Sequence, residues 1–267
     1  MRTKMMNRYL LHFAFRVFVF VGFLLMYIYN RKWMLAVLKH EIHAGITPLH
    51  LIWFVFMSIM ITHIFPSNRL TMALRKSREQ SYVPDTDYSD YELLKFVQDQ
   101  NVKAWMVLLV WLIFNAIWGF FYLIHWITEA ELFMLTVFYY LSDYICIMFF
   151  CPFQRFIMKN RCCVNCRIFD WGHFMMFTPM LFIKSFLSWS LFFTSVVVLI
   201  HWEILYARHP ERFWYGSNKT IRCENCNDKI CRYKKLLGTE PPQNASLLTH
   251  AAAANAPAAG SDEQASE

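Results

Sequence analysis

Long apolar runs separated by short polar stretches make up most of the chain. Residues 10–29, 49–65, 104–127 and 132–151 form four runs that, as helices, approach or match the ~30 Å hydrocarbon core of a bilayer. Only residues 128–131 join the third and fourth runs, so these two runs should form an antiparallel hairpin. The pattern predicts an all-α fold, a polytopic helical bundle in a membrane.

The stretch 168–206 can either cross the membrane once or enter it and return. With the N-terminus inside, Lys and Arg residues collect in the loops that face the cytoplasm, as the positive-inside rule describes. A single crossing would place eight basic residues, between Arg208 and Lys235, on the other side. We therefore expect two arms, 168–184 and 189–206. This gives about six membrane-inserted segments, with the N-terminus and the C-terminus cytoplasmic.

Changes in composition divide the chain into seven expected segments. They are 1–65 with spans 1 and 2, 66–103 as a cytoplasmic loop and helix extension, 104–151 as the hairpin of spans 3 and 4, 152–167 with a first cysteine knuckle, 168–206 as a short membrane hairpin or re-entrant segment, 207–238 as a basic tail with a second knuckle, and 239–267 as a disordered tail. Ser89, three residues before Glu92, predicts a capped helix that continues into span 3. The last segment is rich in Ala, Pro and Ser, with little to bury.

Composition supports a bilayer as the solvent of this chain. Apolar residues make up 57% of it and aromatic residues 18%, which is too apolar for a surface that faces water. The net charge of +7 comes from Lys and Arg residues beside the apolar runs. There they set orientation and attract anionic lipid headgroups, so no nucleic-acid partner is expected.

Six of the eight cysteines lie in two clusters that flank the stretch 168–206. Each cluster contains a C-x-N-C unit, a spacing that lets two thiolates face one tetrahedral metal ion. The predicted ligands of a cytoplasmic zinc site of the four-cysteine type are Cys163, Cys166, Cys223 and Cys226, with Cys162 and Cys231 as additional candidates. In the reducing cytoplasm these thiols stay available for metal. Such a site would clamp the C-terminal tail to the membrane bundle.

The cysteines also fit two other kinds of chemistry. Six thiols exceed the needs of one zinc ion, so an iron–sulfur cluster or a reactive dithiol is the alternative, which would make this a redox membrane protein. Cys146 and Cys151 lie on the fourth apolar run, where we expect small packing residues. The primary hypothesis is a non-enzymatic scaffold or transporter-like bundle.

Two charged residues and one amide lie inside the apolar runs and need partners at membrane depth. They are Arg16, Asn115 and Asp143. An ion pair between Arg16 and Asp143 would neutralise both charges, either to lock the bundle or as part of an ion or proton path. The chain contains no Gly-rich phosphate loop or nucleophile motif, so whether it is an enzyme stays open.

Overall fold

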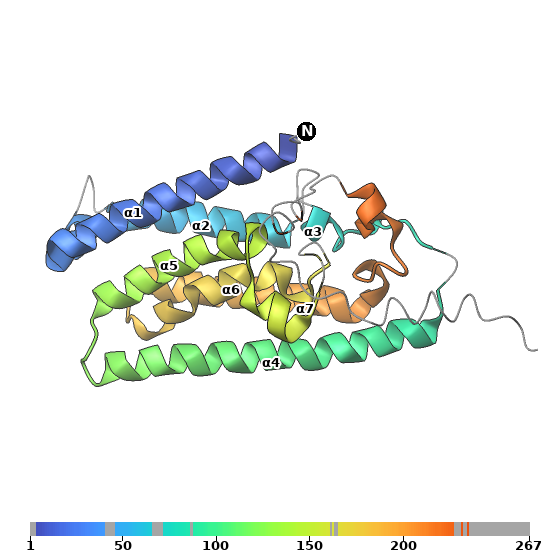
Figure 1. Cartoon of the computed structure of the whole chain (residues 1–267). Coiled ribbons are helices and arrows are strands. Elements are labelled where there is room, and N and C mark those ends of the chain that lie inside the picture. Colours follow the sequence, from blue (N-terminus) through green and yellow to red (C-terminus); the bar gives the residue numbers. More distant parts are fainter. Residues whose placement is uncertain are drawn as a thin grey trace, which may run out of the picture.

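Helices account for all the regular secondary structure within the residues that the structure describes. The computed structural model describes residues 4–40, 46–65, 72–85, 88–160, 162, 165–226, 231 and 234. The longer helices are α1 (Lys4–Lys39), α2 (Pro48–Ile64), α4 (Asp90–Leu123), α5 (Glu129–Met148) and α7 (Phe186–Arg208), and the shorter ones are α3 (Met72–Arg75) and α6 (Gly172–Phe177). The longer helices lie side by side (Figure 1). The predicted all-α fold is confirmed for this part of the chain.

Four helical stretches are long and apolar enough to cross a membrane. They are Asn7–Leu38 within α1, Asp90–Leu123, Glu129–Met148 and Phe186–Arg208. Helix α2 is apolar but shorter than these four. The four stretches indicate a membrane protein. The larger number of about six inserted segments stays a prediction.

Helix α1 consists of two helices joined at Asn30. This residue has φ −164° and ψ 104°, outside the helical region. Its side-chain oxygen accepts hydrogen bonds from the backbone N–H groups of Lys32 and Trp33, at 3.0 and 3.1 Å. Asn30 therefore acts as an N-cap for the second helix. The break falls where the first apolar run was expected to end.

Side-chain caps decide where α4 and α5 begin. The Ser89 side chain accepts from Tyr91 N at 3.3 Å, which caps α4 as predicted. The link from α4 to α5 runs from Ile124 to Thr128, and not over residues 128–131 as expected. The reason is a capping box, in which Glu131 Oε2 accepts from Thr128 N at 2.6 Å and draws Glu129 into the first turn of α5.

The stretch after residue 166 runs along the bundle and returns. Two short 3-10 helices, Arg167–Trp171 and Thr178–Phe182, flank α6, and α7 starts at Phe186. The Trp202 indole donates to Arg167 O at 2.7 Å, whereas the Trp189 indole donates to Leu181 O at 3.2 Å. The two arms are therefore antiparallel, with the reversal near Ile183–Ser185. That both arms enter the membrane stays a prediction. Pro179, which lacks an N–H, lies in the irregular arm.

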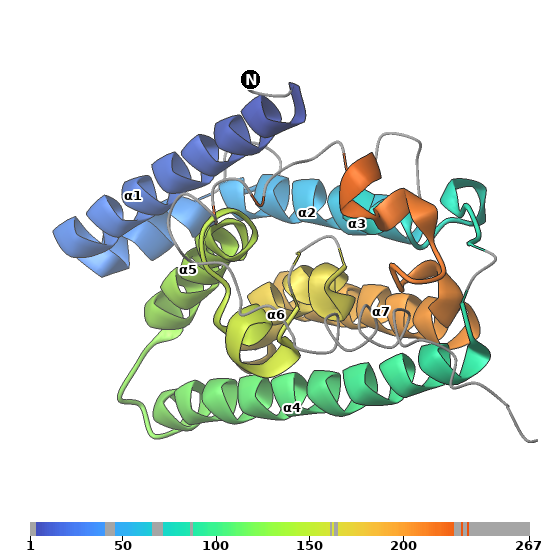
Figure 2. The same ribbon diagram turned by 45° about the vertical axis from the view of Figure 1, so that its right-hand side comes forward.

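The hairpin lies inside the bundle. Helix α6 packs against α5 and α7, α1 packs against α5, and α2 packs against α7. Figures 1 and 2 show α4 on the opposite side of α6 and α7 from α1. The main core cluster includes Trp111, Tyr139, Phe177, Leu191 and Val198. The first arm begins beside the residue where the second arm ends, so residues 166 and 209 lie at one end of the bundle. We call this end, formed by residues 72–85 and 209–226, the basic end.

Candidate functional site

The chain folds back over the basic end after α7. Residues 209–226, which we call the docked segment, contain the 3-10 helices Pro210–Arg212, Lys219–Ile221 and Cys223–Asn225. Asn218 forms an antiparallel bridge with Pro84. Asp85 N donates to Ser217 O at 2.9 Å, and Lys219 N donates to Val83 O at 3.0 Å. Backbone pairing therefore joins the docked segment to the polar stretch before α4.

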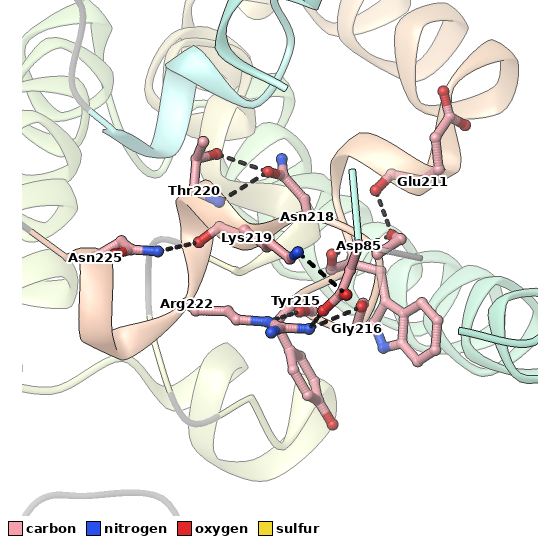
Figure 3. A network of polar contacts seen from close by, with 11 residues as sticks. Asp85, Glu211, Tyr215, Gly216, Asn218, Lys219, Thr220, Arg222 and Asn225 are labelled. Atoms are coloured by element: carbon pink, nitrogen blue, oxygen red, sulfur yellow. Dashed lines mark hydrogen bonds and ion pairs between the residues drawn. The ribbon is translucent and has the colours of Figure 1, made fainter. Parts of the chain in front are cut away.

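Asp85 is the centre of the ionic contacts of the docked segment (Figure 3). Its carboxylate pairs with Arg222 and lies 3.5 Å from Lys219 Nζ. The same guanidinium donates to Tyr215 O at 3.0 Å and to Gly216 O at 3.1 Å. Asp85 is only 8% exposed, and a buried charge needs such partners. One acidic residue thus holds two cations of the C-terminal tail.

Aromatic packing holds the docked segment against α4 and α7. The Phe213 ring meets Trp202 and Tyr206 of α7 at centroid distances of 5.2 and 5.1 Å. The Trp214 ring stacks on Phe96 of α4 at 5.8 Å. Phe213 is 2% exposed, so its contact with α7 is part of the protein interior. The docked segment therefore links the ends of α4 and α7.

Two tyrosines at this junction lie next to acidic groups. Burial, together with Tyr88, raises the pKa of Tyr82 to about 12. Burial, together with the Glu92 charge, also raises the pKa of Tyr215. Both side chains are therefore neutral phenols at neutral pH.

The structure brings one member of each cysteine cluster to the same place. Cys162 and Cys226 both pack against the small core cluster that Ala73 and Ile221 form. Cys166 is buried in a different cluster, and its carbonyl accepts from Lys76 Nζ at 2.9 Å.

Of the other predicted metal ligands, Cys223 and Cys231 are exposed. Cys163 lies outside the described residues. Among the residues described, no group of three or more His, Cys, Asp or Glu side chains is arranged to hold a metal ion. The four-thiolate site therefore stays a prediction.

The ion pair expected between Arg16 and Asp143 is present. Arg16 Nη1 lies 2.8 Å from Asp143 Oδ2, and the guanidinium carbon lies 4.0 Å from the ring centroids of both Tyr140 and Tyr144. A Cβ on Gly172 would come within 2.9 Å of Asp143 Oδ1, so the absence of a side chain there makes room for the carboxylate. The pair joins α1 to α5 across the apolar part of both helices.

Asn115 belongs to a different set of contacts. Its Nδ2 donates to Trp111 O at 3.0 Å, and its Oδ1 accepts from the Tyr139 hydroxyl at 3.2 Å. The Trp111 indole donates to Thr178 Oγ1 at 3.1 Å. Asn115 is 1% exposed, so these bonds satisfy a buried amide. Its contacts are those of a structural link between α4 and α5.

Sequence reasoning missed a buried histidine–carboxylate pair. His63 Nδ1 lies 2.6 Å from Asp170 Oδ1, and the His63 and His173 rings meet edge to face at 4.7 Å. The Asp170 side chain is 6% exposed. Each residue is an isolated polar position in its own stretch. One signal could have found the pair, because a lone Asp in an apolar stretch needs a partner.

A second missed pair connects the two arms of the hairpin. Arg167 pairs with Glu203, and the Trp171 indole donates to the same carboxylate at 2.9 Å. The Arg167 guanidinium carbon lies 4.1 Å from the centroid of the Tyr206 ring. Arg167 directly follows Cys166 of the first cysteine cluster. It is buried and fixes the relative position of the two arms.

Comparison with models of protein families, with curated proteins and with solved structures found no match to this chain.

Proposed function

We propose that this chain is a multi-pass integral membrane scaffold whose basic C-terminal tail is clamped to the cytoplasmic end of its helical bundle. One observation carries the proposal, namely that the antiparallel arms 167–182 and 186–208 bring Cys166 and the docked segment, with Cys223 and Cys226, to the basic end. The docked segment adds the Asp85 contacts and the buried Phe213 there. The clamp would hold the ends of α4 and α7 in a fixed relation.

The distribution of charge supports a cytoplasmic position for the basic end. Residues 72–85 and 209–226 carry Arg75, Lys76, Arg78, Arg212, Lys219 and Arg222. The opposite end of the bundle carries fewer basic residues, namely Arg31, Lys32, Lys39 and Lys184. The positive-inside rule assigns the richer end to the cytoplasm. Basic side chains at that level would bind anionic lipid headgroups.

Zinc would complete the clamp by drawing thiolates from both clusters. The packing of Cys162 and Cys226 against one small cluster, that of Ala73 and Ile221, supports a shared site. The proposed ligands are Cys163, Cys166, Cys223 and Cys226, with Cys162 and Cys231 as substitutes. A zinc ion with four thiolates carries a net negative charge, and basic residues flank both clusters. Metal binding of this kind contributes about 10–16 kcal/mol in zinc-finger peptides.

A pair of reporter fusions tests the membrane orientation. A fluorescent protein and a periplasmic-type phosphatase, each fused after Leu237, report opposite sides of the membrane. We expect fluorescence and no phosphatase activity, because the hairpin returns the tail to the cytoplasm. The same reporters fused after residue 45, between α1 and α2, provide the matched control and should give the reverse pattern. Phosphatase activity from the fusion after Leu237 would contradict the proposal.

A further inference from the structure

Cys146 and Cys151 form a hydrogen-bonded dithiol where α5 ends. The helix ends at Met148, so Cys151 lies beyond the span and next to the last turn of α5. The Cys146 thiol hydrogen-bonds the Cys151 sulfur. Gln154 N also donates to Cys151 Sγ at 3.4 Å. The two residues were expected to be small packing side chains, an interpretation that leaves these contacts without a role.

A buried lysine from the C-terminal part of the chain lies beside this dithiol. Lys234 Nζ donates to Cys146 O at 3.0 Å and to Gln154 Oε1 at 2.6 Å. The hydrogen bond from Cys146, the backbone N–H of Gln154 and the Lys234 charge lower the pKa of Cys151 to about 7, against the opposing effect of burial. The lowered pKa raises the thiolate fraction of Cys151 above that of an ordinary cysteine, and the thiolate is the reactive form of cysteine.

Cys146 and Cys151 line an apolar cavity of about 580 Å³ between α4, α5 and α6. Its volume is within the range of small-molecule sites in proteins. Aromatic side chains form much of the wall, among them Trp111, Phe114, Phe138, Tyr139 and Phe153. Cys166 of the first cysteine cluster also lines it. The cavity therefore combines a two-electron donor with a surface suited to a flat apolar ring.

We propose that this cavity binds a lipid-soluble quinone and that the Cys146–Cys151 dithiol reduces it. The Cys151 thiolate and the Cys146 thiol form a disulfide and release two electrons and one proton. The quinone takes up both electrons, that proton and one further proton from water, and leaves as the hydroquinone. The proposal is independent of the zinc site, because neither cysteine is among its ligands.

The chemistry of the cavity selects this occupant. The acceptor has to take two electrons, because closing a disulfide releases two. It has to be apolar and planar to pack on the aromatic wall, and it has to reach a site inside a membrane bundle. A lipid-soluble quinone meets all three requirements. Thiols of the reducing compartment would then regenerate the dithiol by exchange.

Single-turnover reduction of a decyl-substituted benzoquinone tests the proposal. Reduced full-length protein in detergent is mixed with this quinone without oxygen, and the loss of quinone absorbance is followed. The thiols are then alkylated and the peptides identified by mass spectrometry. We expect one quinone consumed per chain in a saturable phase, together with a Cys146–Cys151 disulfide. Cys146→Ser and Cys151→Ser should each abolish both signals. Ser58→Ala, on an exposed position of α2, should preserve them.

Two further measurements separate a built site from incidental thiol oxidation. Ser142→Phe narrows the cavity. It should raise the half-saturating quinone concentration by about tenfold, while alkylation of Cys151 by iodoacetamide keeps its rate. That alkylation should follow a midpoint near pH 7 in the wild type, and Cys146→Ala should move the midpoint upward.

Three results would overturn the proposal. One is quinone loss at the wild-type rate in Cys151→Ser with an unchanged melting temperature. Another is a rate that rises linearly with quinone and does not respond to Ser142→Phe. A midpoint of Cys151 alkylation at the ordinary thiol pKa would remove the basis for its reactivity. If Cys151→Ser fails to fold, Cys151→Ala takes its place in the same assay.

Discussion

The indole of Trp202 donates a hydrogen bond of 2.7 Å to the carbonyl of Arg167, which fixes the start of the irregular arm to the last turns of α7. Trp202 is 2% exposed, so water cannot take the place of its indole N–H as the donor to this carbonyl. The adjacent ion pair between Arg167 and Glu203 joins the same two arms. Together these contacts hold Cys166, which precedes Arg167, and the docked segment, which follows α7, at one end of the bundle.

Trp202→Phe should destabilise the fold measurably. The substitution keeps an aromatic ring but removes the N–H, which leaves a buried carbonyl unsatisfied at a cost of about 1–3 kcal/mol. Trp189→Phe removes the equivalent bond to Leu181 O at an exposed position, so it should cost less. Melting temperatures of both variants in the same detergent provide the measurement. Equal shifts would show that the Trp202 bond has no special role.

Asp85→Asn should release the docked segment without unfolding the bundle. The amide retains the shape of the side chain but loses the attraction to Arg222 and Lys219. Limited proteolysis with trypsin should therefore cut at Arg222 faster than in the wild type, while the melting temperature changes little. Asp90→Asn, at an exposed position of the first turn of α4, is the control. Unchanged cleavage in Asp85→Asn would contradict the assigned role of this carboxylate.

Arg16 and Asp143 should be energetically coupled. Removing one member leaves a charge that the apolar surroundings do not solvate, whereas removing both does not. The double variant Arg16→Gln with Asp143→Asn should therefore be more stable than the worse single variant, with a coupling of about 1 kcal/mol or more. Unfolding of all four proteins in detergent gives the cycle. A loss in the double variant equal to the sum of the single losses would mean that the pair contributes nothing.

The sequence predicted those parts of the structure that depend on local patterns. Apolar runs located the long helices, and Ser89 located the start of α4, because a cap acts within a few residues. The charge of Arg16 and Asp143 was enough to suggest their pairing, since few charges lie at membrane depth. The link before α5 was misplaced because Thr128 and Glu131 were read as loop, although together they form a capping box.

Contacts between distant single residues could not be found in this way. His63 and Asp170 are 107 positions apart, and Asp85 and Arg222 are 137 apart. Neither pair produces a periodic signal in its own stretch. The spacing of the cysteines suggested two units of one site, but which side chains lie together depends on how Ile221 of the docked segment packs with Ala73. That packing follows from the tertiary fold.

Zinc content of the full-length protein, purified without a His tag, tests the central claim most directly. If thiolates from both clusters clamp the tail, elemental analysis should find one zinc per chain. Cys166→Ser and Cys226→Ser should each abolish it, because neither C-x-N-C unit alone completes a tetrahedron. Cys231→Ser should retain it. Iron with acid-labile sulfide would favour the redox alternative for these clusters, and a reduced, folded protein without metal would contradict the clamp by zinc.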